Sequence, residues 1–171
     1  MSEQITKEQL FGGIAAPSEP HMACVLLLDI SSSMKGAPIQ SLNEAIAKFK
    51  QQVCQDPLAR KRVEVAIVTF ETHVEIVSDF MPIDQMPAIT LEPGGQTHMA
   101  EAIQVAIDLV KKRTREYQGV GVPCFKPWIF MITDGVSMST PEAMQEAAAR
   151  IHEEESKGSN LSLIHISEPT R

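Results

Sequence analysis

Three short polar segments carry the residue types from which proteins build sites for hard metal ions. They are Asp29–Ser33, with the sequence D-I-S-S-S, Gly94–Thr97, with the sequence G-G-Q-T, and Thr133–Gly135, with the sequence T-D-G. Their side chains offer carboxylate and hydroxyl oxygens, which suit Mg²⁺, an ion that takes six oxygens at about 2.0–2.1 Å and rarely all of them from protein. A site of this composition predicts a divalent cation with one position left for a partner.

Each polar segment adjoins a predicted strand or helix. Ala23–Leu28 is a continuous apolar run, typical of a central strand buried on both faces of a parallel sheet, and the first segment follows it. The second segment precedes a helix predicted from Thr97 or His98 to Arg115, and the third ends another buried run, Trp128–Thr133. Ligands of doubly wound α/β folds bind at the carboxyl ends of the strands, so we expect one shared site there.

The other periodicities complete the predicted fold. Apolar residues at steps of three and four predict a helix over Pro38–Val53. Val63–Phe70 and Val74–Met81 are β-rich runs joined by a short turn, which predicts a hairpin. Thr140 is expected to cap a helix that runs to about Lys157 and stops at Gly158. The expected fold class is α/β, a doubly wound and mostly parallel sheet with one antiparallel edge strand and helices on both faces.

Together the three segments resemble the metal-ion-dependent adhesion site of von Willebrand factor A domains. That site has the pattern D-x-S-x-S, then a Thr, then an Asp, and this sequence matches it with Asp29, Ser31, Ser33, Thr97 and Asp134. The resemblance covers about Cys24 to Gly158. One departure is Ser32, which stands where the family often has glycine, but the change removes no ligand.

The resemblance implies a protein-binding module and no catalysed reaction. By likeness Ser31 and Ser33 ligate the metal directly, and Thr97 does so directly or through water. Asp29 and Asp134 mainly orient these groups. The expected cofactor is a divalent metal ion, Mg²⁺ ahead of Mn²⁺ or Ca²⁺, and the expected partner is a protein that presents an Asp or Glu carboxylate to it.

Within the family, the sequence is most similar to small bacterial stand-alone members of the tellurium-resistance and chemical-stress type. The similarity lies in four stretches, which are Leu28–Gln40, Asp56-Pro57, Val68–Phe70 and Lys126–Trp128. This likeness implies a partner or regulatory subunit of a stress-response system.

The expected domain occupies residues 23–158. Residues 1–22 mix Gly, Pro, Ser and charged residues without a period, and we expect an N-terminal arm that is flexible or laid over the surface. Residues 159–171 form an atypical tail that resembles a foreign or frame-shifted ending, although Leu161–Ile166 has the pattern of one more strand. Because the family usually has a further strand and helix, we expect a domain truncated at the C-terminus, an incomplete sheet edge and marginal stability.

Composition narrows the classes of partner. The 171 residues include 15 Lys and Arg against 22 Asp and Glu, a formal net charge of -7. This charge repels nucleic acid and anionic lipid surfaces, so we expect neither as a partner. With no signal pattern and no long apolar run, we expect a cytoplasmic protein. Three cysteines without a C-x-x-C pair suggest neither a disulfide framework nor a zinc cluster.

Two alternatives stay open at this stage. Each polar segment, taken alone, is also typical of a turn or a helix cap, with Thr97 as the cap of its helix. The second alternative is an enzyme, a metal-assisted phosphohydrolase that uses Asp29 as its nucleophile. That alternative lacks a second aspartate two residues after the first, and it lacks a phosphate loop ending in Lys-Ser or Lys-Thr.

Overall fold

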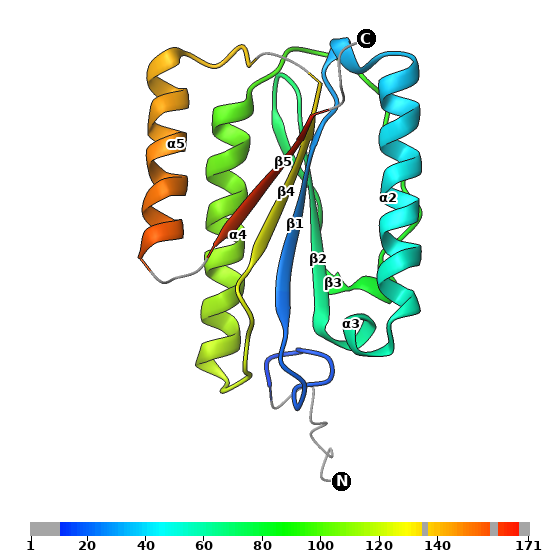
Figure 1. The fold of residues 1–171 in the computed structure, drawn as a ribbon, viewed down its shortest axis with the longest axis vertical. Coiled ribbons are helices and arrows are strands. Elements are labelled where there is room, and N and C mark those ends of the chain that lie inside the picture. The colour runs from blue at the N-terminus through cyan, green and yellow to red at the C-terminus, as the bar shows by residue number, and fades with distance from the viewer. Residues whose placement is uncertain (1–10, 135–136, 158–160, 168–171) are drawn as a thin grey trace, which may run out of the picture.

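The computed structural model describes residues 11–134, 137–157 and 161–167, and its centre is a five-stranded sheet with the order β3-β2-β1-β4-β5 (Figure 1). The elements in chain order are β1 (Met22–Asp29), the 3-10 helix η1 (Ser32–Met34), α2 (Ala37–Gln55), α3 (Pro57–Arg62), β2 (Val63–Phe70), β3 (Val74–Pro82), the 3-10 helix η2 (Ile83–Gln85), α4 (Met99–Gly119), β4 (Trp128–Thr133), α5 (Pro141–Ser156) and β5 (Ser162–Ser167).

The strand pairings confirm the predicted fold class. β1 lies at the centre and runs parallel to both β2 and β4, and β4 runs parallel to β5. β2 and β3 form the one antiparallel pair, as the hairpin pattern predicts, with a register irregularity between Val65 and Val68. Helices cover both faces of this mixed sheet (Figure 1).

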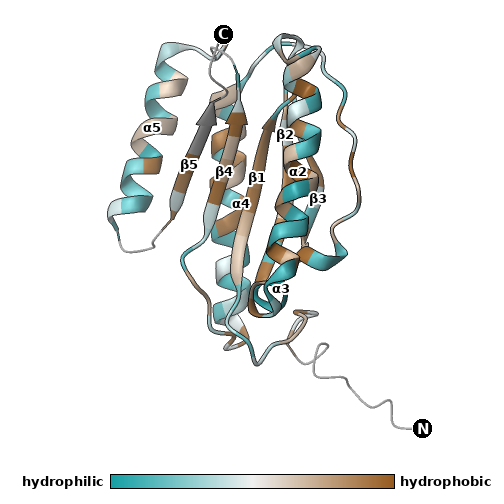
Figure 2. Ribbon diagram, turned by 45° about the vertical axis from the view of Figure 1, so that its right-hand side comes forward, coloured by the Kyte–Doolittle hydropathy of each residue, from teal (hydrophilic) through white to brown (hydrophobic). Residues whose placement is uncertain are grey.

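Alternation along the central strand divides the core into two layers. Val25 and Leu27 pack under α4 and α5, whereas Leu26 and Leu28 pack under α2. β1 and β2 are accordingly buried along almost their whole length, whereas the edge strand β3 is half-buried or exposed, and hydrophobic and hydrophilic residues alternate along the helices (Figure 2). Burial on both faces explains why β1 is a continuous apolar run in the sequence.

Helix boundaries follow local capping chemistry. The hydroxyl of Thr140 accepts a hydrogen bond from the Ala143 N–H at 3.2 Å and starts α5, which confirms the predicted cap. Asp56 caps α3 in the same way through the N–H groups of Leu58 and Ala59. The sequence pattern does not predict α3, because its six residues, PLARKR, carry no apolar period.

The described half of the N-terminal segment lies against the amino-terminal end of the sheet, which we call the foot. Ile14 is 1% exposed and packs with Tyr117 and Val122. His21 is buried, stacks on the Tyr117 ring and donates its backbone N–H to Pro123 at 2.8 Å. Residues 11–21 are thus laid over the domain, and residues 1–10 lie outside the described residues.

At the other end of the chain, the predicted extra strand is present. β5 pairs with β4 from Ser162 opposite Trp128 to Ser167 opposite Thr133. Leu161 is buried with the core under α5. Gly158, the expected end of α5, lies outside the described residues, as do residues 159–160 and 168–171. None of the helices in the described part combines the length and apolar character that a bilayer crossing requires.

A buried charge network holds the foot together. Arg113 on α4 donates two hydrogen bonds to the Glu64 carboxylate, at 3.1 and 2.9 Å, and the Tyr117 hydroxyl donates a third. Glu64 is 2% exposed, so these donors are what allow a carboxylate to remain inside the fold. Burial, reinforced by the Glu64 carboxylate, raises the pKa of Tyr117 far above its ordinary value and keeps its hydroxyl a donor.

Replacing Arg113 tests this network. We expect Arg113→Met to lower the free energy of unfolding by about 3–5 kcal/mol, because it leaves a buried carboxylate without its cation. The measurement is urea denaturation followed by circular dichroism. Combining Arg113→Met with Glu64→Gln, which removes the buried charge, should recover most of the lost stability. A free energy of unfolding of Arg113→Met within about 1 kcal/mol of the parent would contradict the assignment.

Candidate metal centre

The predicted site lies at the carboxyl edge of the central strands, where three loops are tied to one another through their backbones. The edge is at the top of the view in Figure 1. Ile30 donates its N–H to Phe70 at the end of β2, at 3.0 Å, and accepts from Gly94 at 2.7 Å. Ser32 donates to the Gly95 carbonyl at 3.0 Å. The loop after β1 and the loop before α4 therefore form one backbone unit.

Asp29 is the fixed centre of this edge. Its side chain is fully buried. One carboxylate oxygen accepts the Ser31 N–H at 2.8 Å, and the other accepts the Thr133 hydroxyl at 2.6 Å. Thr133 ends β4, and the register explains its position, since Leu28 pairs with Ile132 and the next residues of the two strands face each other. Thr133 orients the aspartate, a role that the sequence analysis did not assign to it.

Three further predicted residues form a chain of oxygens beside Asp29. The hydroxyls of Ser31 and Ser33 lie 3.0 Å apart, and Ser33 donates to a carboxylate oxygen of Asp134 at 3.0 Å. Ser31 is the N-cap residue of η1, but its side chain makes no capping hydrogen bond. The helix-cap alternative is therefore wrong for Ser31, whose hydroxyl instead joins the chain of oxygens. Gly135, the third residue of its motif, lies outside the described residues.

Thr97 is held at the same edge by its neighbours. It is 5% exposed, and its carbonyl accepts the Met138 N–H at 2.7 Å. The residues on either side of it are bound to the β2–β3 turn, because Gln96 donates to the Thr72 hydroxyl at 3.0 Å and His98 donates to the Glu71 carbonyl at 3.1 Å. His98 is the N-cap residue of α4, so the alternative of Thr97 as the cap is wrong. The five predicted residues thus lie on three connected loops.

Gly95 allows the β2–β3 turn to approach this loop closely. Its φ is +75°, and a Cβ built on it would overlap the Glu71 carboxylate and lie 2.7 Å from the Thr72 hydroxyl. Hydrogen bonding from the Thr72 N–H holds the pKa of Glu71 below its ordinary value. Neither Glu71 nor Thr72 was recognised in the sequence as part of the site, since their roles depend on contacts more than 20 residues apart.

The donor set suits a hard divalent cation in composition and spacing. Two oxygens bound at right angles to one Mg²⁺ at 2.0–2.1 Å lie about 3 Å apart. The two serine hydroxyls have this separation. In the part of the chain that the structure describes, neither Asp29 nor Asp134 forms an ion pair with a Lys, Arg or His. A buried carboxylate without a cationic partner favours binding of a cation beside it.

Comparisons with known proteins agree with the fold. The sequence profile of the von Willebrand factor type A domain matches residues 24–137, more than half of the chain. Among solved structures, the ArnB paralog VWA2 from Sulfolobus acidocaldarius is 18% identical with a TM-score of 0.55, over 86% of this chain and 35% of that one. The vWF domain of the type V pili tip protein Mfa5 from Porphyromonas gingivalis is 22% identical with a TM-score of 0.51, over 72% and 43%.

A third solved structure, the PilB minor pilin from Streptococcus sanguinis, is 15% identical with a TM-score of 0.55, over 69% of this chain and 30% of that one. The chain therefore spans less than half the length of each of these proteins. At these identities the structural likeness establishes the fold. A search of curated protein sequences found no match.

Adjacent glycines provide a matched test of the loop. We expect Gly95→Ala to lower the free energy of unfolding by about 2 kcal/mol or more, because alanine strains the left-handed backbone and displaces Glu71. Gly94→Ala is the control, since its added Cβ meets no atom within 4 Å and its φ is not positive. Both values come from chemical denaturation, and equal losses in the two variants would contradict the close approach.

Proposed function

The chain belongs to the von Willebrand factor type A domain family, and from this premise we propose that it binds a divalent metal ion at the carboxyl edge of its sheet and uses that ion to bind a partner protein. Protein–protein interaction is the general role of the family. The observation that carries the metal proposal is the fully buried Asp29, whose carboxylate accepts hydrogen bonds from the Ser31 N–H and the Thr133 hydroxyl and has no cationic side chain paired to it in the described residues.

Some of these residues are proposed to coordinate the metal, and the others to orient the coordinating groups. Ser31 and Ser33 offer neutral hydroxyls for direct coordination, and Thr97 offers a third, directly or through water. Asp29 is already engaged by two donors, so it suits the role of an orienting acceptor. Asp134, which follows the carboxyl end of the neighbouring strand β4, accepts a hydrogen bond from Ser33 and so orients its hydroxyl. Mg²⁺ matches this oxygen set, with Mn²⁺ and Ca²⁺ as alternatives.

The proposed partner presents an Asp or Glu carboxylate. A cation held mainly by neutral hydroxyls keeps much of its charge, so it attracts an anionic ligand more strongly than an amide of the same shape. The net charge of -7 opposes long-range attraction of an acidic partner. Recognition of the carboxylate then depends on the local ion, and the surrounding loops supply specificity.

We propose no catalysis at this site. Both carboxylate oxygens of Asp29 accept hydrogen bonds and its side chain is fully buried, which leaves it poorly placed to attack a phosphoryl group. Incubation with an aryl phosphate in Mg²⁺ tests the alternative phosphohydrolase. Turnover abolished by Asp29→Asn would contradict the proposal.

A finer proposal concerns the cellular setting. On the resemblance of Leu28–Gln40 and Lys126–Trp128 to stand-alone bacterial members, we place the chain as a partner or regulatory subunit of a tellurium-resistance or chemical-stress system. Proteins captured from a tellurite-treated bacterial extract, with and without chelator, test this setting.

Serine substitutions test metal binding directly. We expect Ser31→Ala combined with Ser33→Ala to weaken Mg²⁺ or Mn²⁺ binding by at least about 100-fold, because two direct ligands are lost. Ser32→Ala is the matched control, since Ser32 is exposed and only its backbone enters the loop contacts. Calorimetric titration gives the affinities and circular dichroism checks the fold. Unchanged affinity in the double variant would reject the ligand assignment.

Thr97 separates metal binding from partner binding. We expect Thr97→Ala to lower the affinity for a captured partner by about tenfold and the affinity for the metal by less than about threefold. The reason is that the hydroxyl is proposed to change between direct and water-mediated contact with the metal when a carboxylate of the partner binds. Thr97→Ser should restore the partner affinity. The partner is measured with Mg²⁺, with EDTA, and after Asp→Asn or Glu→Gln changes on its surface, and equal affinities under all three conditions would exclude the mechanism.

A further inference from the structure

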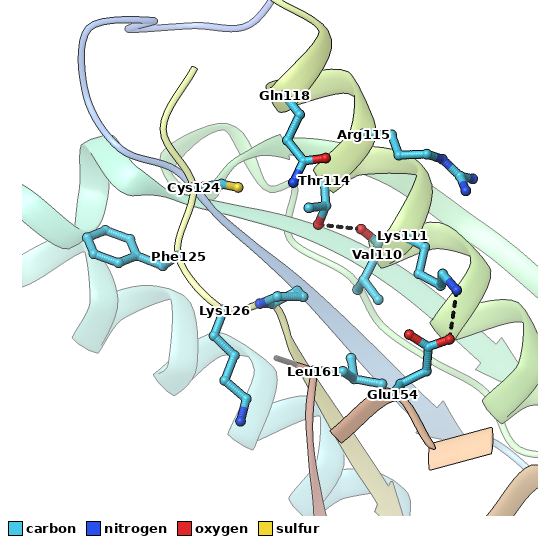
Figure 3. Close-up of a pocket in the computed structure, with 11 residues that line it drawn as sticks. Val110, Lys111, Thr114, Arg115, Gln118, Cys124, Phe125, Lys126, Glu154 and Leu161 are labelled. Carbon is cyan, nitrogen blue, oxygen red and sulfur yellow. Dashed lines mark hydrogen bonds and ion pairs between the residues drawn. The ribbon is translucent and has the colours of Figure 1, made fainter. Parts of the chain in front are cut away.

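A cavity of about 350 Å³ opens between the second half of α4, the loop before β4, the end of α5 and the start of β5 (Figure 3). Thr114, which lines it, lies 15 residues after Met99 at the start of α4, on the order of 22 Å along the helix. The cavity is therefore remote from the proposed metal site. Its volume lies at the small end of the range for small-molecule sites, about 300–1,000 Å³.

One face of α4 gives the cavity a polar wall. Lys111, Thr114, Arg115 and Gln118 line it, and their spacing of three, four and seven residues places them on one stripe of the helix. The Thr114 hydroxyl donates to the Val110 carbonyl at 2.8 Å. The Gln118 amide stands free over the cavity (Figure 3), and in the described residues it makes no side-chain hydrogen bond.

The charges around the cavity leave an excess of cations. Lys111 is neutralised by the buried Glu154 at 2.7 Å. Arg115 on α4 and Lys126 on the loop before β4 both line the cavity, with their head groups directed outward into solvent (Figure 3), and neither forms an ion pair within the described ranges. Burial raises the pKa of the Cys124 thiol, so this residue adds no negative charge. Two unpaired cations at one cavity contrast with the net charge of -7 on the chain.

Apolar groups form the remaining walls. Pro127 and Leu161 are buried and line the cavity where β4 and β5 begin. Phe125 lies at the rim, is 48% exposed, and has the Arg62 guanidinium carbon 6.0 Å from its ring centroid. A ligand that suits these walls has an apolar body as well as an acidic group.

We propose that this cavity is a second binding site and that it takes a small amphipathic anion, a carboxylate attached to an aromatic or aliphatic body. The acid group is held by Arg115, Lys126 and the Gln118 amide, and the body lies against Phe125, Pro127 and Leu161. Both cations are exposed and change rotamer readily, so they turn over the acid group when the ligand enters. Guanidinium and ammonium groups bind carboxylates by charge-assisted hydrogen bonds.

The test uses 4-phenylbutyrate and its neutral amide, two probes of similar shape that differ in charge. Both are titrated into ¹⁵N-labelled protein in EDTA, so that carboxylate binding at the proposed metal site does not contribute. We expect saturable shifts of the backbone N–H signals of residues 110–118 and 124–126, with the carboxylate probe bound about tenfold more tightly than the amide probe, the size of one charge-assisted hydrogen bond.

Charge variants locate the binding site of the acid group. Arg115→Gln with Lys126→Gln should reduce the preference for the carboxylate to less than about twofold, whereas Lys35→Gln with Lys48→Gln, which makes the same change of net charge at two exposed lysines that do not line the cavity, should preserve it. Phe125→Ala should lower the affinities for both probes by the same factor. Binding of neither probe, equal affinities for the two, or a preference that survives in the Arg115, Lys126 variant would each overturn the proposal.

Discussion

Asp29 ends the central strand with a carboxylate that no solvent reaches, and much of the carboxyl edge is arranged around this fact. Its two oxygens need donors, and they obtain them from a backbone N–H two residues later and from a hydroxyl on the neighbouring strand. The first contact turns the loop after β1 back on itself, and the second joins the ends of β1 and β4, which the strand register brings together. The serines that follow are then presented side by side, 3.0 Å apart. A polar group in the core thus organises the loops above it.

The antiparallel β2–β3 hairpin also contacts this edge. The turn between β2 and β3 binds the segment around Thr97 through two backbone N–H groups, and Gly95 permits it to approach without a side chain between them. The antiparallel hairpin therefore contributes to the position of a site that it does not itself line. The Glu64 network at the foot has the complementary effect, because it fixes the opposite end of α4 against β2. Both ends of that helix are set by contacts with the hairpin.

Sequence patterns were sufficient wherever a residue's role depended on its close neighbours. Buried runs predicted β1 and β4, and Thr140 with the following proline predicted the start of α5. The five proposed site residues could be identified because the short segments that carry them lie beside predicted elements and resemble the metal-ion-dependent adhesion site. The role of Thr133 could not be found in this way, since it depends on the register between strands far apart in the sequence. The same holds for the contact of Glu71 with Gly95 and for the cavity, whose walls combine residues between Val110 and Pro127 with Glu154 and Leu161. The helix α3 was missed for a different reason, because it is short and mostly exposed.

The pairing of Asp29 with Thr133 spans 104 residues, and this has a consequence for how the chain is made. While the polypeptide emerges from the ribosome, β1 can pair with β2 early, but its other edge stays open until β4 has been synthesised. During that interval an apolar strand exposes unpaired backbone groups, and the aspartate at its end lacks one of its two donors. Parallel pairing over such a separation closes slowly, because the loop must lose its entropy before the contacts form. The nascent chain is thus most exposed to aggregation before its second half leaves the exit tunnel, and chaperone binding in that interval would protect the central strand.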